Sequence, residues 1–125
     1  MVSVLTGENS FGLQKRLAEL VGTFVTEQGD LALERVDGEE AELAKIQEAL
    51  NGLPFLAAKK LVVLRAPSTN KQFVEQAEQL LNDLPETTEV IIVEPKLDKR
   101  TAYYKFLKSK TDFEEFNELD QNGLA

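Results

Sequence analysis

Residues 2–24 read VSVLTGENSFGLQKRLAELVGTF, and they carry two different periodicities on either side of a glycine turn. Residues 2–6 are short, apolar and β-branched, as expected of a strand, and Gly7 ends the run. After the turn, apolar side chains recur at the spacing of a helix with one buried face, at Phe11, Leu13, Leu17, Leu20, Val21 and Phe24. The stretch therefore predicts a strand, a turn and an amphipathic helix.

The same alternation continues to the end of the chain. Further strands are predicted at residues 31–36, 61–64, 90–93 and 112–117, and further helices are predicted from Asp37, Thr69 and about Lys99. The runs LVVL (61–64) and VIIV (90–93) have the continuous apolar character of central strands covered on both faces. We therefore expect an α/β fold, a doubly wound, mostly parallel five-stranded sheet with helices on both faces.

The composition excludes several classes of function. The 125-residue chain is long enough for one domain, and no apolar run approaches the ~20 residues that cross a bilayer. It contains no cysteine and no histidine, which excludes thiolate chemistry, a Ser-His-Asp triad and an imidazole zinc site within the chain. We expect a cytoplasmic protein with no membrane partner, no metal site and no cofactor.

The net charge of −8 argues against strong direct binding to DNA, which needs clustered lysine and arginine. One local exception is a basic strip at residues 96–110, KLDKRTAYYKFLKSK. Two interpretations stay open for this strip: a solvated helix face, or a contact to an acidic partner.

The turn after the first strand has the glycine spacing of a phosphate-binding loop, but it lacks the charge chemistry. Gly7 and Gly12 match G-x-x-x-x-G, whereas the Lys and Ser/Thr that should follow are Leu13 and Gln14. Lys15 is rotated by roughly 200° around the helix from the required lysine position. We predict a degenerate loop that binds no nucleotide; the alternatives are an ordinary strand–turn–helix connection and an atypical nucleotide site.

The ends of the other two central strands offer no catalytic group. Arg65 stands where an ATPase would place an acidic residue for Mg²⁺, and a lone Glu94 at a strand end is expected to face solvent. No catalytic residue is predicted.

The connection before the third strand is unusually apolar. Residues 53–60 read LPFLAAKK, whereas connections in α/β proteins are usually short and polar. Two interpretations are open: Phe55 and Leu56 form an exposed apolar knob for a partner's pocket, or they pack under the sheet as core.

The chain resembles the N-terminal domain of the delta subunit of bacterial DNA polymerase III, a clamp-loader subunit. The resemblance spans the whole chain and rests on LTGENSF (5–11), LPFLAAKKLVVLR (53–65), VIIVEPKLDKRTAYYKFLK (90–108) and FNEL (116–119). It implies a RecA-like (AAA+) core whose nucleotide site has been lost. It also implies lid and collar domains beyond residue 125, so we expect residues 1–125 to be one domain excised from a longer chain.

The resemblance implies a mechanical function in DNA replication. A hydrophobic element that matches Phe55 and Leu56, with Leu53 beside them, would bind the sliding clamp (the beta subunit) and help to open it. Other clamp-loader subunits would be further partners of the full-length protein. The domain itself would not be an enzyme, although the family's subunit belongs to a DNA-directed DNA polymerase holoenzyme. The alternatives are an atypical nucleotide-binding domain and a structural scaffold that works through the basic strip.

Overall fold

The computed structural model describes residues 1–117. Its elements follow the chain in the order β1 (Val2–Thr6), α1 (Ser10–Gln28), η1 (Asp30–Ala32), β2 (Leu33–Asp37), α2 (Leu43–Asn51), β3 (Lys60–Arg65), η2 (Pro67–Thr69), α3 (Lys71–Asn82), β4 (Thr88–Glu94), α4 (Ala102–Lys110) and β5 (Asp112–Glu115). Residues 118 and 119 of the FNEL motif lie outside the described part. None of the helices described is long and apolar enough to cross a membrane.

The five strands form one sheet in the order β2-β3-β4-β1-β5, and every neighbouring pair is parallel. Parallel neighbours require helical crossovers, and α1 to α4 supply them. The predicted α/β class is confirmed, and the sheet is parallel throughout rather than mostly parallel.

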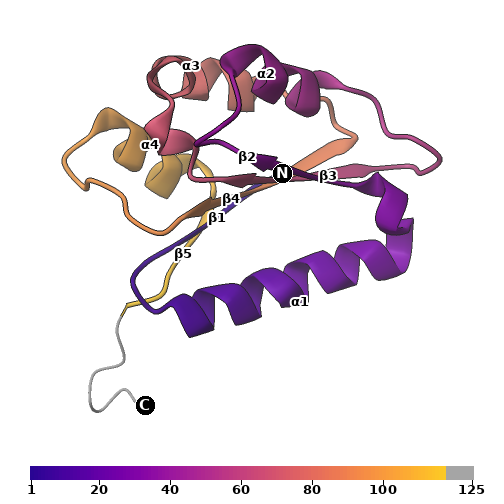
Figure 1. Ribbon diagram of the computed structural model, residues 1–125, viewed down its shortest axis with the longest axis horizontal. Coiled ribbons are helices and arrows are strands. Elements are labelled where there is room, and N and C mark those ends of the chain that lie inside the picture. The colour runs from indigo at the N-terminus through magenta and orange to yellow at the C-terminus, as the bar shows by residue number, and fades with distance from the viewer. Residues whose placement is uncertain (118–125) are drawn as a thin grey trace.

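The helices cover both faces of the sheet, with α2, α3 and α4 on one face and α1 on the other (Figure 1). Alternate residues of β3 face the two layers of helices. Val62 and Leu64 pack with α2, α3 and α4, whereas Leu61 and Val63 pack with α1. Burial on both faces explains why the central strands read as unbroken apolar runs.

Two predicted helix starts are wrong, since α2 begins later in the chain and α3 is capped by the next residue. Helix α2 begins at Leu43 rather than near Asp37, whose carboxylate instead accepts the backbone N–H of Glu39 in a turn. Helix α3 is capped by Asn70 rather than Thr69, since the Asn70 side chain accepts the N–H of Phe73 at 3.0 Å.

Two residues assigned to buried patterns are exposed. Phe11, in the first turn of α1, is 79% exposed, so the apolar face of the helix begins at Leu13. Leu31 lies in η1, ahead of β2, and is also exposed.

The chain leaving β5 crosses directly over the β1–α1 turn. The N–H of Phe116 donates to the Thr6 carbonyl at 2.7 Å, and the Phe116 carbonyl accepts the N–H of Asn9 at 2.9 Å. Gly7 has φ +126°, and a Cβ added there would collide with the Phe116 backbone. Glycine is needed at this position for both backbone conformation and close approach.

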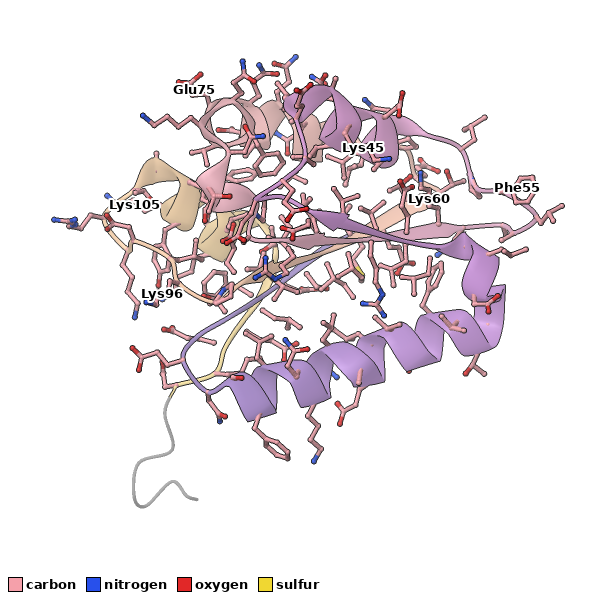
Figure 2. The ribbon with its side chains drawn as sticks, viewed as in Figure 1. Lys45, Phe55, Lys60, Glu75, Lys96 and Lys105 are labelled. Atoms are coloured by element: carbon pink, nitrogen blue, oxygen red, sulfur yellow. The ribbon has the colours of Figure 1, made fainter. Side chains whose placement is uncertain are left out.

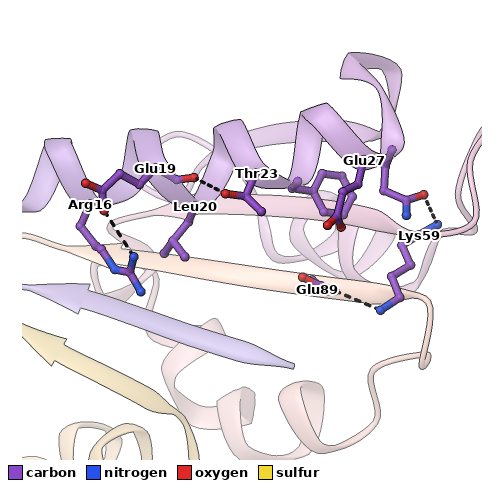
Figure 3. Close-up of a pocket in the computed structure, with 9 residues that line it drawn as sticks. Arg16, Glu19, Leu20, Thr23, Glu27, Lys59 and Glu89 are labelled. Carbon is purple, nitrogen blue, oxygen red and sulfur yellow. Dashed lines mark hydrogen bonds and ion pairs between the residues drawn. The ribbon is translucent and has the colours of Figure 1, made fainter.

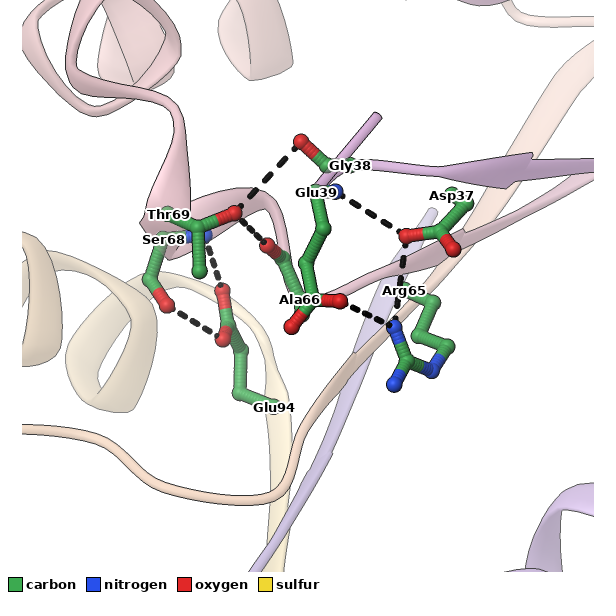
Figure 4. Close-up of polar contacts among 8 residues, drawn as sticks. All are labelled: Asp37, Gly38, Glu39, Arg65, Ala66, Ser68, Thr69 and Glu94. Atoms are coloured by element: carbon green, nitrogen blue, oxygen red, sulfur yellow. Dashed lines mark hydrogen bonds and ion pairs between the residues drawn. The ribbon is translucent and has the colours of Figure 1, made fainter. Parts of the chain in front are cut away.

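Glu94, the last residue of β4, ties two neighbouring elements to the sheet. Its carboxylate accepts the backbone N–H and the hydroxyl of Ser68 at 2.9 and 2.7 Å, as drawn in Figure 4. It also accepts the hydroxyl of Tyr103, in α4, at 2.9 Å. The carboxylate is fully buried, and burial raises its pKa although the bonds from Ser68 and Tyr103 lower it.

Gly7→Ala tests the close approach of the Phe116 backbone. We expect the substitution to lower the free energy of unfolding by about 2–3 kcal/mol, since alanine adds a collision and a disfavoured φ. Gly22→Ala, in α1 with open space around it, is the matched control and should raise stability by about 0.5–1 kcal/mol. Urea unfolding measures both changes, and equal effects would contradict this role of Gly7.

Glu94→Gln tests the raised pKa of the buried carboxyl. The folded state holds this proton more tightly than the unfolded state, so Glu94 lowers stability as the pH rises from about 4.3 through its folded pKa. The stability of Glu94→Gln relative to the wild type should therefore increase over that range and then level off. Urea unfolding at a series of pH values measures it, with exposed Glu75→Gln as control. A pH-independent difference would refute the raised pKa.

Candidate functional site

The carboxyl ends of the central strands lie side by side, where ligands bind in sheets of this kind. Thr6 of β1 pairs with Glu94 of β4, and Arg65 of β3 pairs with Val93. A ligand or catalytic site is therefore expected at this edge.

Two amides of the glycine loop, those of Asn9 and Gly12, are already engaged by the protein. The Asn9 side chain accepts the N–H of Gly12 at 3.0 Å and caps α1, and the Asn9 N–H donates to Phe116. A phosphate would need free amides at this helix start. The structure therefore places both glycines beside Phe116. Gly7 lies against the Phe116 backbone, and Gly12 lies near its ring.

The two residues after Gly12 lie on different sides of α1. Leu13 is buried in the core under the helix, and Gln14 is exposed. A pocket of about 260 Å³ lies beside the loop and includes Glu8, Lys96, Lys99 and Glu115. The amine of Lys99 pairs with the Glu115 carboxylate at 3.1 Å, so the pocket presents mixed charge.

Arg65, at the end of β3, makes ion pairs at the same edge. Its guanidinium lies 3.2 Å from the Asp37 carboxylate and 3.3 Å from that of Glu39 (Figure 4). The pKa of Arg65 is raised mainly by Glu39 and then by Asp37. Within residues 1–117, acidic side chains form no cluster that could hold a metal ion.

The expectation that Glu94 faces solvent is wrong, because Ser68 and Tyr103 enclose it. The three hydrogen bonds that it accepts explain its burial without a substrate or a metal.

The apolar loop, defined here as residues 53–59 between α2 and β3, projects from the opposite edge of the sheet. Leu53, Phe55 and Leu56 are 79, 65 and 77% exposed, and Figure 2 shows Phe55 at the outer end of the loop. Ala57 instead packs against the core under α1. Of the two interpretations of Phe55 and Leu56, the geometry is that of the exposed knob.

The basic strip is partly neutralised within the chain. Arg100 binds both oxygens of Asp98 at 3.0 Å, and this contact lowers the pKa of Asp98 to about 2. Lys99 pairs with Glu115, and the Lys108 amine lies 5.8 Å from the centre of the Tyr104 ring. The strip is therefore not a uniform patch of free positive charge.

Two residues near the apolar loop have no signal in the sequence analysis. Gln28, the last residue of α1, accepts the backbone N–H groups of Ala58 and Lys59. Leu31 lies at the same edge as the loop, since Leu33 pairs with Leu61 across β2 and β3. A polar side chain beside a glycine stop gives no indication of a partner 30 residues away.

Comparison with known proteins is consistent with this architecture. A family model described as DNA polymerase III, delta subunit, matches residues 4–117. A search of curated proteins finds no match.

Two solved structures are similar to the chain. The DNA clamp loader delta protein of Bacillus subtilis has a TM-score of 0.82 and 25% identity, over 98% of this chain and 40% of that one. A DNA polymerase III gamma subunit-related protein from Thermotoga maritima has a TM-score of 0.61 and 18% identity, over 98% of this chain and 43% of that one. The second likeness shows the fold alone, which is RecA-like.

The chain thus spans well under half the length of the chains it matches. The family model covers nearly the whole of it. This chain belongs to the DNA polymerase III delta subunit family.

Proposed function

We propose that this chain is a non-catalytic clamp-loader domain that binds the sliding clamp through its apolar loop and helps to open it. The observation that carries the proposal is the exposure of Leu53, Phe55 and Leu56 on one loop of a chain from the delta family. Large apolar side chains grouped on a projecting loop are suited to a partner's pocket.

The proposed mechanism is mechanical. Phe55 and Leu56 enter an apolar pocket on the clamp, and each contributes roughly 1.5–3 kcal/mol from burial before ordering costs. These two side chains anchor the complex, and surrounding contacts supply the rest. The clamp opens only if its open form binds this domain more tightly than its closed form.

The carboxyl edge of the sheet has no part in this function. Phe116 covers the glycine loop, and Arg65 stands where an ATPase would need an acidic residue. These contacts support a degenerate nucleotide site at Gly7, Gly12, Leu13 and Gln14, and a domain that is not itself an enzyme. As the first domain of a longer cytoplasmic subunit, it would meet other clamp-loader subunits as well.

Phe55→Ala and Leu56→Ala test the apolar loop. Each should weaken binding to the cognate sliding clamp by at least about tenfold, because each removes an anchor that is buried only in the complex. Surface plasmon resonance measures the affinity, and circular dichroism should be unchanged.

Phe11→Ala is the matched control for Phe55→Ala. Phe11 is also largely exposed but lies at the other end of α1, about 25 Å of helix from the loop. The control should bind the clamp as the wild type does. Native affinity in both loop variants would show that the clamp site lies elsewhere.

Isothermal titration with Mg-ATP tests the degenerate nucleotide site. We expect no heat beyond dilution, because Leu13 stands in place of the phosphate-binding lysine and the amides of Asn9 and Gly12 are engaged. Micromolar binding would favour the atypical nucleotide-binding alternative instead.

A further inference from the structure

The tip of the apolar loop has a backbone conformation that its sequence disfavours. Leu56 has φ +55°, in the left-handed region that side chains with a Cβ rarely adopt. Such a conformation persists where the surrounding structure holds it in place. The contacts of residues 57–59, called here the foot of the loop, therefore decide the conformation in which Phe55 and Leu56 are held.

Gln28 supplies the main polar contact at that foot. Its side-chain oxygen accepts the backbone N–H of Ala58 and that of Lys59, both at 3.2 Å. Within the described residues 1–117, these are the hydrogen bonds that the structure gives to the backbone of residues 53–59. One amide oxygen has two lone pairs, so it can serve both donors at once.

Two further contacts fix the same foot. Ala57 packs against the core under α1, and the Lys59 amine pairs with Glu89 of β4 at 3.4 Å. Figure 3 shows Lys59 between the end of α1 and Glu89. Residues 57–59 are thus tied to the domain, while Leu53, Phe55 and Leu56 project from it.

We propose that Gln28 is a positioning residue, which holds the apolar loop in the conformation that enters the clamp's apolar pocket. This inference rests on the proposed function. A loop that visits other conformations binds with an affinity reduced by the fraction of time in the competent one. Gln28 therefore raises clamp affinity without touching the clamp, by removing an ordering cost.

Gln28→Met and Gln28→Glu separate the acceptor from the shape of the side chain. Methionine has a similar length but no strong acceptor, whereas a carboxylate keeps two acceptor oxygens. We expect Gln28→Met to weaken binding to the cognate sliding clamp by about tenfold, the effect of losing two modest hydrogen bonds. Gln28→Glu should bind the clamp within about twofold of the wild type. The matched control is Gln76→Met, on the exposed face of α3, which should bind as the wild type does.

Surface plasmon resonance with the immobilised clamp gives the affinities. Amide hydrogen exchange of Ala58 and Lys59 in the free protein shows whether the loop backbone has been released, and the melting temperature shows whether the whole domain has been weakened. In Gln28→Met both amides should exchange faster, while the melting temperature of the domain stays unchanged. If that variant folds poorly, Gln28→Asn provides a second test, since its shorter side chain cannot reach both amides.

The outcomes distinguish this inference from the proposed function. If Phe55→Ala loses binding while Gln28→Met keeps native affinity, the positioning role is wrong and the clamp site stands. An equal loss in Gln28→Met and Gln28→Glu would also overturn the role of the acceptor. Native binding by Phe55→Ala would instead overturn the proposed function itself.

Discussion

The parallel direction of all five strands is the constraint from which the arrangement follows. It places every strand's carboxyl end at one edge of the sheet and every amino end at the other. The glycine turn follows β1 and lies at the first edge, whereas the apolar loop precedes β3 and lies at the second. A strand of five or six residues separates the two edges by roughly 17–20 Å. The glycine turn and the apolar loop are therefore separated by the full length of the strands.

The glycine loop shows that a G-x-x-x-x-G spacing can serve structural needs alone. Gly7 is required by the passage of the Phe116 backbone, and a Cβ at Gly12 would lie 3.0 Å from the Asn9 side chain that caps α1. Both demands are structural, so the spacing persists without a phosphate to select it. The fold then depends on the crossing of Phe116, because this crossing also extends the pairing of β5 beside β1.

The fold was predictable because hydrophobic periodicity determines it, as the runs 61–64 and 90–93 show. The sequence indicates the apolar loop, because its composition is unusual for a connection. It does not predict the exposure of Phe55 and Leu56, since this depends on how Ala57 packs against the core. The start of α3 was predicted one residue early because Thr69 and Asn70 are both possible caps by residue type, and the structure uses the Thr69 hydroxyl on the Ala66 carbonyl instead. The burial of Glu94 and the contact of Gln28 with the apolar loop could not be predicted. Their partners come from elements distant in sequence, which no local pattern indicates.

Under the proposed function the apolar loop bears a load, and β3 is the rigid strand that anchors it. Lys60, the first residue after the apolar loop, donates its N–H to Thr87 at 2.8 Å, and its amine pairs with Glu34 at 3.0 Å. The strand that follows is paired on both sides, with β2 and β4. A load on Phe55 would therefore pass into hydrogen-bonded neighbours rather than into a free connection. An edge strand, paired on one side, would give way more easily, so the central place of β3 is consistent with the proposed mechanical function.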